Sequence, residues 1–182
     1  MREHDQTLET PRLVLRRFTD AAADLDAYCG LYADPEVARH VGGVQSRETG
    51  EQTFRQRVLD YYAQHPGLGI WATFERDGGA FVGLHLLNHI RGEPHIQVGY
   101  TLRRAIWGRG YATEMAREVM RYGFDTLGLA QVNAITNLDN LASQQVLHKL
   151  AFVRDGERQF AAYGPAPLAW FTCPAARFAA AP

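Results

Sequence analysis

Lysine, serine and cysteine are scarce in this chain of 182 residues, and each scarcity restricts the chemistry. Lys149 is the only lysine, so a Schiff-base mechanism would depend on one residue at the end of an expected helix. Ser46 and Ser143 are the only serines, and neither lies in a G-x-S-x-G nucleophile elbow, which argues against serine-hydrolase chemistry. Cys29 and Cys173 form no metal or redox motif. We therefore expect free thiols and a cytoplasmic protein.

Long apolar runs and an excess of charge of one sign are also missing. No run approaches the roughly 20 residues of a membrane span, and the amino terminus, MREHDQTLET, lacks the apolar core of a signal peptide. The formal net charge of −1 provides no overall field for nucleic acid. We therefore expect neither a membrane nor a nucleic acid as partner.

The residues that are present have the composition of a soluble globular protein, with 46% hydrophobic and 21% charged residues. A chain of this length suffices for one domain with a sizeable core. We expect a single domain over residues 1–182, with residues 1–8 as a loose tail. No linker, internal repeat or low-complexity segment divides it.

Hydrophobic periodicity predicts an α/β (α+β) fold with about seven strands. Asp77-Gly78-Gly79 favours a hairpin between two of them. Helices are expected to begin at Thr19-Asp20, Asp34-Pro35 and Ser46, whose side chains suit N-caps. Two further helices follow residues 110 and 140. The expected strands cover residues 12–18, 69–76, 80–90, 131–136, 152–163 and 168–173, and a central strand begins at residue 96.

The stretch 96–127 organises the chain. It begins with strand-like alternation and ends with apolar residues at helical spacing, and a turn with two glycines, Gly108 and Gly110, joins the two parts. Glycines let the backbone approach a ligand closely, and the first amides of a helix attract an anion. The turn therefore suggests a phosphate site, although many such turns bind nothing.

Four segments in order resemble the GNAT superfamily of N-acetyltransferases, most of all the branch named for ribosomal-protein N-terminal acetyltransferases. The resemblance covers roughly residues 9–172. Its segments are Thr10-Pro11-Arg12-Leu13-Val14-Leu15-Arg16, then Gly99-Tyr100 with Trp107-Gly108-Arg109-Gly110-Tyr111-Ala112-Thr113-Glu114, then Asn137-x-x-Asn140-x-x-Ser143 with Val146-Leu147-x-Lys149-Leu150-Ala151-Phe152, and finally Arg154-Asp155-Gly156. Trp107 fits this branch, whereas Arg104 stands where a proline is usual.

The resemblance implies a bent mixed sheet that is splayed at the central strand and flanked by helices, with acetyl-CoA bound in the splay as co-substrate. The pyrophosphate would lie on the amides of the glycine turn, and the pantetheine arm would pair with the central strand. Arg103, Arg104 or Arg109 would neutralise phosphate charge. The cofactor-binding residues implied are Tyr100, Thr101, Leu102, Gly108, Arg109, Gly110, Tyr111, Ala112, Thr113, Asn140 and Ser143.

The resemblance also implies direct acetyl transfer to a primary amine without an acyl-enzyme. A backbone N–H near Val98 would stabilise the oxyanion, and a side chain would protonate the leaving thiolate. Many relatives carry a tyrosine at the position of Leu147 for this purpose, so Ser143, one turn earlier, is the expected substitute. Asn140 would hold the pantetheine or a water. Both Ser143 and Asn140 also suit a role as helix caps, and both readings stay open.

The general base is the clearest departure, because Gln97 stands where relatives often have a glutamate. His95, on the same strand face, and His85 or His89 are alternatives, with water carrying the proton. The substrate itself is another possibility: an α-amine of pKa about 7.8 is about a quarter neutral at pH 7.4, whereas a lysine amine near 10.4 is about 0.1% neutral. Losing the carboxylate would then favour an α-amine or another amine of low pKa.

Several alternatives complete the expectations. A metal is not expected, because His85 and His89 would lie roughly 13 Å apart along a strand. A dinucleotide-binding oxidoreductase lacks its third glycine, since Thr113 stands there. A non-catalytic acyl-CoA sensor is the remaining rival.

The acceptor is left open among peptide amino termini, aminoglycosides, polyamines and other small amines. The resemblance places its site among the first helices, the Trp71 strand and the last hairpin, with Trp71 and Tyr163 as candidate lining or core residues. Relatives include dimers, so a homodimer is a further possibility.

Overall fold

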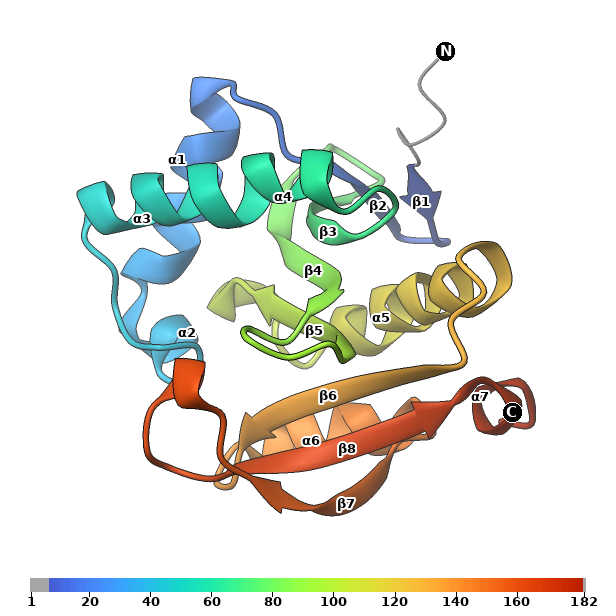
Figure 1. The fold of residues 1–182 in the computed structure, drawn as a ribbon. Coiled ribbons are helices and arrows are strands. Elements are labelled where there is room, and N and C mark those ends of the chain that lie inside the picture. Colours follow the sequence, from blue (N-terminus) through green and yellow to red (C-terminus); the bar gives the residue numbers. More distant parts are fainter. Residues whose placement is uncertain (1–6, 182) are drawn as a thin grey trace.

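The computed structural model describes residues 7–181, which form one eight-stranded sheet flanked by helices (Figure 1). The strands lie in the order β1-β2-β3-β4-β5-β6-β8-β7. Their bounds are β1 Leu8–Glu9, β2 Leu13–Arg17, β3 Gly69–Glu75, β4 Phe81–His89, β5 Ile96–Leu102, β6 Gln131–Asn137, β7 Val153–Arg158 and β8 Leu168–Pro174.

The sheet opens between β5 and β6. Every other pair of neighbouring strands is antiparallel, whereas β5 and β6 run parallel and are bridged at one residue pair, Gln97 with Asn133. Beyond this bridge the two strands diverge, and Figure 1 shows β6, β8 and β7 as a group set apart from the first five strands. The expected splay at the central strand is confirmed.

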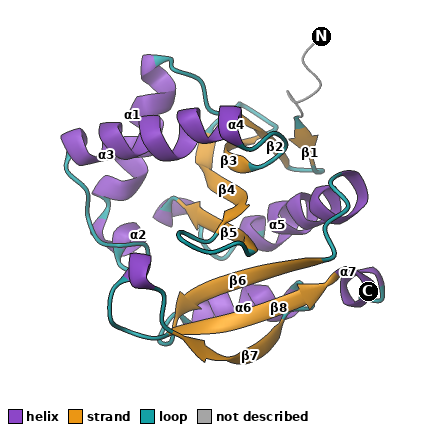
Figure 2. Cartoon of the chain, viewed as in Figure 1, coloured by secondary structure: helices purple, strands orange, loops and turns teal. Residues whose placement is uncertain are grey.

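Two helical layers cover the sheet (Figure 2). The amino-terminal layer is formed by α1 Ala22–Ala33, α2 Pro35–Ala38, α3 Arg47–Phe54 and α4 Asp60–Gln64, with the π-helical segment Arg55–Leu59 joining α3 to α4. The opposite layer contains α5 Tyr111–Arg121, which continues into the π-helical segment Tyr122–Thr126, and α6 Leu141–Lys149. A short helix, α7 Ala175–Ala179, follows β8, and 3-10 turns occur at Arg104–Ile106 and Ala161–Tyr163.

Strand alternation divides the apolar side chains between two cores, because successive residues point to opposite faces. Trp71 on β3 packs with Met115 and Val119 of α5 on one face. Its neighbour Ile70 packs with Phe54 and the aromatic residues of α1 on the other. The sheet is therefore buried on both faces, and its opening is lined by α5 and α6 on one side and by the amino-terminal helices on the other.

The expected element types hold, with four corrections. The sheet has eight strands instead of about seven, because the short β1 pairs Leu8 with Leu15. Leu8, expected in the loose tail over residues 1–8, therefore belongs to a strand, and residues 1–6 lie outside the described residues. The expected cap at Thr19-Asp20 is wrong, since α1 begins after Ala21 without a side-chain cap. The strand expected over 152–163 ends at residue 158, where the chain turns towards the 3-10 helix.

Two caps and the hairpin are confirmed. The Asp34 carboxylate accepts the amide of Glu36, and the Ser46 hydroxyl accepts the amide of Thr49. The glycines of the 77–79 turn both have positive φ, as a tight hairpin requires. Within residues 7–181, no helix is long and apolar enough to cross a membrane.

Candidate active site

The free edge of β5 forms one wall of the opening in the sheet. The bonds from Ile90 N–H to the His95 carbonyl and from Arg103 N–H to the Val82 carbonyl fix the phase of the antiparallel ladder with β4. Because the bonding direction alternates along an antiparallel strand, the backbone groups of Val98, Tyr100 and Leu102 point away from β4, into the opening. Thr101, which was expected to pair with the pantetheine, points its backbone groups towards β4 instead.

The far end of this edge is partly occupied. Trp107 donates its indole N–H to the Leu102 carbonyl at 2.8 Å. At the near end, the Asn133 amide donates to the Ile96 carbonyl at 2.9 Å. The parallel bridge of Gln97 with Asn133 takes up the Val98 amide, because in a parallel pair the residues that flank the bridged one make its hydrogen bonds. The unpaired backbone beyond the bridge belongs to the Val98 carbonyl and to Tyr100, which leaves a short edge for an extended ligand.

The glycine turn lies beyond this edge and opens directly onto α5. Gly108 and Gly110 have φ of +78° and +80°, the left-handed region that glycine adopts without strain. No side chain caps α5, and the first hydrogen bond into this turn runs from the Glu114 amide to the Gly110 carbonyl. Within the described chain, the amides of Tyr111, Ala112 and Thr113 make no hydrogen bond, so they present donors and the positive end of the helix dipole to an anion.

A network around Glu114 anchors the turn to the first strands. The Glu114 carboxylate accepts from the Thr10 hydroxyl at 2.6 Å and from Arg12 Nε at 2.7 Å, and Arg12 also donates to the Arg109 carbonyl at 3.0 Å. Burial would raise the pKa of Glu114, but these hydrogen bonds and the Arg12 charge outweigh burial and lower it. Arg109 itself lies 3.5 Å from Glu75, so its charge is already partly balanced.

The start of α6 faces the same opening. The Asn140 side chain accepts the Ser143 amide at 3.1 Å and so caps the helix. The Tyr100 hydroxyl lies 3.0 Å from the Ser143 carbonyl and 3.1 Å from its hydroxyl. Either hydroxyl can be the donor in the second contact. When Tyr100 donates to the Ser143 hydroxyl, the serine proton is left free to point to another acceptor. Leu147 is buried in the core, and its aliphatic side chain has no proton to donate.

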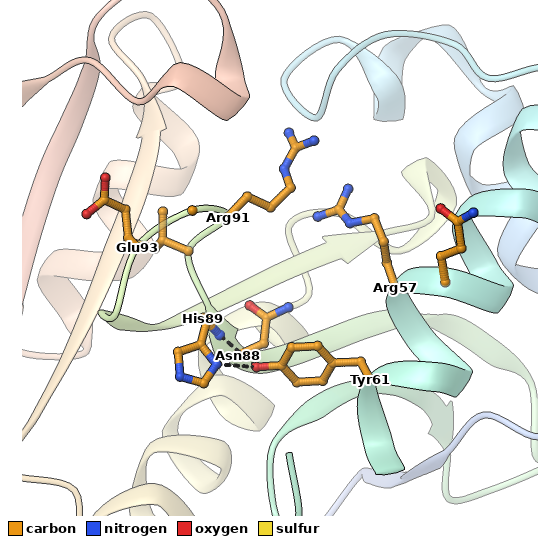
Figure 3. Close-up of a pocket in the computed structure, with 9 residues that line it drawn as sticks. Arg57, Tyr61, Asn88, His89, Arg91 and Glu93 are labelled. Carbon is orange, nitrogen blue, oxygen red and sulfur yellow. Dashed lines mark hydrogen bonds between the residues drawn. The ribbon is translucent and has the colours of Figure 1, made fainter. Parts of the chain in front are cut away.

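A pocket of about 410 Å³ lies on the face of the sheet opposite α5 and α6. It lies between the amino-terminal helices and the end of β4 (Figure 3). Tyr61 of α4 forms one wall, and the β4–β5 turn forms another. The Tyr61 hydroxyl accepts the His89 amide at 3.0 Å and lies 2.7 Å from His89 Nδ1. The hydroxyl donates to Nδ1 when that nitrogen carries no proton. Burial and the nearby His65 lower the pKa of His89, so its ring is neutral at pH 7.

The pocket reaches the opening in the sheet through a buried amide pair. Asn88 lines the pocket, and its carbonyl oxygen accepts the Gln97 amide at 3.3 Å. Gln97 in turn lies opposite Asn133, at the bridge where β5 and β6 separate. The Asn88–Gln97 pair therefore lies between the pocket and the opening.

The other histidines named from the sequence lie elsewhere. His85 is fully buried beside Thr73, with Nδ1 2.8 Å from the hydroxyl, and burial lowers its pKa to about 3. It does not line the pocket. His95 packs its ring against Trp170 at 5.3 Å, and it does not line the pocket either. Its assignment as a base stays a prediction. Within residues 7–181, no group of three or more potential metal ligands gathers.

Sequence reasoning missed several residues of this site. Arg57, Tyr61 and Glu93 line the pocket, and the Tyr100 side chain meets Ser143. The turn after β4 was a usable signal for Glu93, because it leads directly into the central strand, β5. Arg57 gave no local signal, since its place in the pocket depends on packing with a segment about 30 residues away. Trp71, by contrast, is a core residue, packed edge-on to Tyr122.

Known proteins resemble this chain in sequence and fold. The family model described as Acetyltransferase (GNAT) domain matches residues 12–153. The uncharacterized N-acetyltransferase YoaA of Bacillus subtilis is 33% identical over 153 residues, which are 82% of this chain and 84% of the relative. An acetyltransferase structure from Agrobacterium tumefaciens superposes with a TM-score of 0.79 at 27% identity, covering 91% of this chain and 93% of that one. The fold is also similar to RimL, a ribosomal L7/L12 alpha-N-protein acetyltransferase, with a TM-score of 0.76 at 16% identity over 93% of this chain and 94% of that one.

Proposed function

The chain belongs to the GNAT acetyltransferase family and is an N-acetyltransferase, and on that premise we propose that it transfers the acetyl group of acetyl-CoA directly to a primary amine. The observation that carries this proposal is the opening between β5 and β6. A strand edge with unpaired backbone lies along it, a helix start with free amides follows the end of that edge, and the Gln97–Asn88 pair links the bridge to a separate pocket.

The glycine turn fits the phosphates of acetyl-CoA. Two left-handed glycines and an uncapped α5 present backbone donors, which bind a phosphate without any side-chain charge. We assign the pyrophosphate to the amides at 108–113. Arg103 and Arg104 are better placed than Arg109 to balance its charge, because Arg109 already faces Glu75. Tyr100 offers its backbone groups to the pantetheine arm, as an edge strand does to a peptide.

The chain's own groups support direct transfer. Burial raises the pKa of the Cys29 thiol and raises that of Cys173 to about 11, so neither is a ready nucleophile. When bound, acetyl-CoA supplies the thioester. A backbone N–H of the β5 edge near Val98 would stabilise an oxyanion. The Ser143 hydroxyl, when it accepts from Tyr100, would give its proton to the departing thiolate.

The amine would arrive through the pocket. Asn88 in its lining and Gln97 behind it carry neutral amides, which can orient an amine but cannot take a proton at neutral pH. His89 is neutral, yet its Nδ1 is already in contact with the Tyr61 hydroxyl. These features favour an acceptor that is partly neutral in solution, such as an α-amine.

Release of free CoA, measured with a thiol reagent over a panel of amines, tests the proposal. We expect CoA release together with an acetylated product by mass spectrometry. Acetyl-CoA binding without CoA release for any amine would support the rival reading, a non-catalytic sensor. Equal pH–rate profiles for a lysine side chain and an α-amine would refute the preference for an amine of low pKa.

A further inference from the structure

The charged groups at the pocket mouth indicate what kind of amine enters it. Arg57 and Arg91 both line the pocket, and Glu93 is its only carboxylate within residues 7–181. We propose that the acceptor is an amine that also carries a carboxylate, which is held between Arg57 and Arg91. This inference rests on the proposed function, since it assigns the acceptor of the same reaction.

The two arginines are presented from different elements. Arg57 lies in the π-helical segment Arg55–Leu59, and such segments often occur at functional sites. Arg91 lies in the β4–β5 turn, with its guanidinium stacked 4.3 Å from the centre of the Tyr163 ring. Figure 3 shows the two guanidinium groups pointing toward one another, whereas the Glu93 carboxylate points away from them.

Neither arginine has its charge balanced by a carboxylate of the described chain, although Arg91 stacks on Tyr163. Within residues 7–181, neither Arg57 nor Arg91 forms an ion pair with an acidic side chain, although nine other arginines do. Arg55 shows the contrast most clearly, because it lies two residues from Arg57 and pairs with Glu51 at 3.3 Å. Two unpaired guanidinium groups facing one pocket are suited to an anionic ligand, and their planar donors match a carboxylate.

The sum of charges favours a monoanion over a phosphate. The lining carries two positive charges from the arginines and one negative charge from Glu93, and His89 is neutral. The net charge of +1 is balanced by one carboxylate, whereas a dianionic phosphate would leave an excess of negative charge.

The volume of the pocket suits such a molecule, and the position of the opening in the sheet orients its amine and its carboxylate. Its 410 Å³ lies at the small end of the usual range of ligand pockets, about 300–1,000 Å³. The amine must reach the opening in the sheet, and the Asn88–Gln97 pair lies between the pocket and that opening. The carboxylate then lies towards the arginines at the other end. A short peptide amino terminus with an acidic side chain has this shape.

Matched pairs of acceptors test the proposal. Each pair consists of an acid and its amide, such as the dipeptide amide Ser-Asp with Ser-Asn. We expect kcat/KM to favour the acid, and Arg57→Gln or Arg91→Gln to reduce the acid-to-amide ratio about 10-fold, as the loss of a charge-assisted hydrogen bond predicts. Comparing this ratio between enzymes cancels the intrinsic difference in amine pKa within each pair.

The matched control is Arg55→Gln, which removes an arginine from the same segment but outside the pocket. It should keep the wild-type ratio. Circular dichroism of each variant checks that the fold is retained. An unchanged ratio in both Arg57→Gln and Arg91→Gln overturns the proposal, as does a preference for a phosphorylated amine over the carboxylate.

A binding measurement separates this inference from the proposed function. Titration of the same acids and amides by NMR, followed through the arginine side chains, does not require turnover. Acid-selective binding that Arg57→Gln abolishes, without CoA release, would refute the acetyl transfer while supporting the anion site. CoA release with equal use and binding of acid and amide would refute the anion site alone.

Discussion

Gly108 is the position at which the phosphate site can be tested with the least disturbance. Its φ of +78° lies in the left-handed region, yet a Cβ built there meets no atom within 4 Å. Alanine at this position therefore strains the backbone without crowding the protein. Gly108→Ala should reorient or block the neighbouring amides while leaving the rest of the fold in place.

The two effects of Gly108→Ala, backbone strain and the loss of a hydrogen bond to the ligand, are estimated separately. Holding alanine in the left-handed region costs about 1 kcal/mol, which lowers the melting temperature of a chain of this size by roughly 2–4 °C. Losing one charge-assisted hydrogen bond to the pyrophosphate costs about 1.5–3 kcal/mol. At 1.36 kcal/mol per tenfold change, KM for acetyl-CoA should rise about 10- to 150-fold.

Gly128 provides the matched control, because its φ of +67° and the empty space around its Cβ are equivalent. It lies after the Tyr122–Thr126 segment, outside the glycine turn. Gly128→Ala should lose the same stability and keep the wild-type KM for acetyl-CoA. Steady-state kinetics and thermal denaturation of both variants measure the two effects. Equal KM values for Gly108→Ala and Gly128→Ala would refute the assignment of the phosphates to this turn.

Three further predictions concern catalysis and stability. Ser143→Ala should lower kcat at least about 10-fold with little change in KM for acetyl-CoA, whereas Ser46→Ala should lose about 1 kcal/mol of stability as a missing cap and keep kcat; equal kcat values would contradict the role of Ser143. Burial alone would raise the pKa of Asp24, but its bonds to Arg16, both 2.8 Å, and to Thr19 lower it, so its stabilisation is full above about pH 4 and is lost at more acidic pH. Thermal denaturation from pH 3 to 7 should show a weaker acid dependence for Asp24→Asn, and parallel curves would exclude this pair as a cause. Phe54→Ala should cost about 3–5 kcal/mol in urea unfolding, because the ring is buried between two other aromatic rings; a cost below about 1 kcal/mol would show that the core refills.

The sequence predicted best those features that a few adjacent residues determine. The glycines of the 77–79 hairpin and of the 108–110 turn all adopt positive φ, because no other residue takes that conformation as easily. The caps at Asp34 and Ser46 formed for the same reason: a short polar side chain lies next to the amides it accepts. These local rules located the glycine turn and the start of α5.

Competition between polar groups explains why the N-cap expected at Thr19-Asp20 is wrong. Thr19 has the right chemistry for an N-cap, but its amide and hydroxyl both donate to Asp24, at 2.7 and 2.9 Å. Asp24 is drawn there by Arg16 on the neighbouring strand. The helix therefore begins after Ala21, because the Arg16–Asp24 pair, which no local rule describes, engages the Thr19 hydroxyl.

The pocket that we propose for the acceptor could not be located from the sequence for a related reason. Its arginines lie 34 positions apart, and the π-helical segment that carries Arg57 has no distinctive sequence pattern. Only part of the role of Tyr100 could be predicted from the sequence. Its backbone was expected at the opening, but the contact between its hydroxyl and Ser143 depends on how β5 and α6 approach one another across the splay.

Gln97, which stands where relatives often have a glutamate, and the two arginines Arg57 and Arg91 all bear on the charge in and next to the pocket. Gln97 is buried, and its amide donates to Asn88; a glutamate there would lose this donor and carry a desolvated charge. It would also cancel the net positive charge that Arg57, Arg91 and Glu93 give the lining. A pocket for an acceptor with its own carboxylate is better served by a neutral side chain at this position. On the proposed function, the loss of the usual base is therefore coupled to the choice of acceptor. An acceptor that carries a carboxylate needs a positively charged pocket. Its amine, if of low pKa, has less need of a carboxylate that removes its proton.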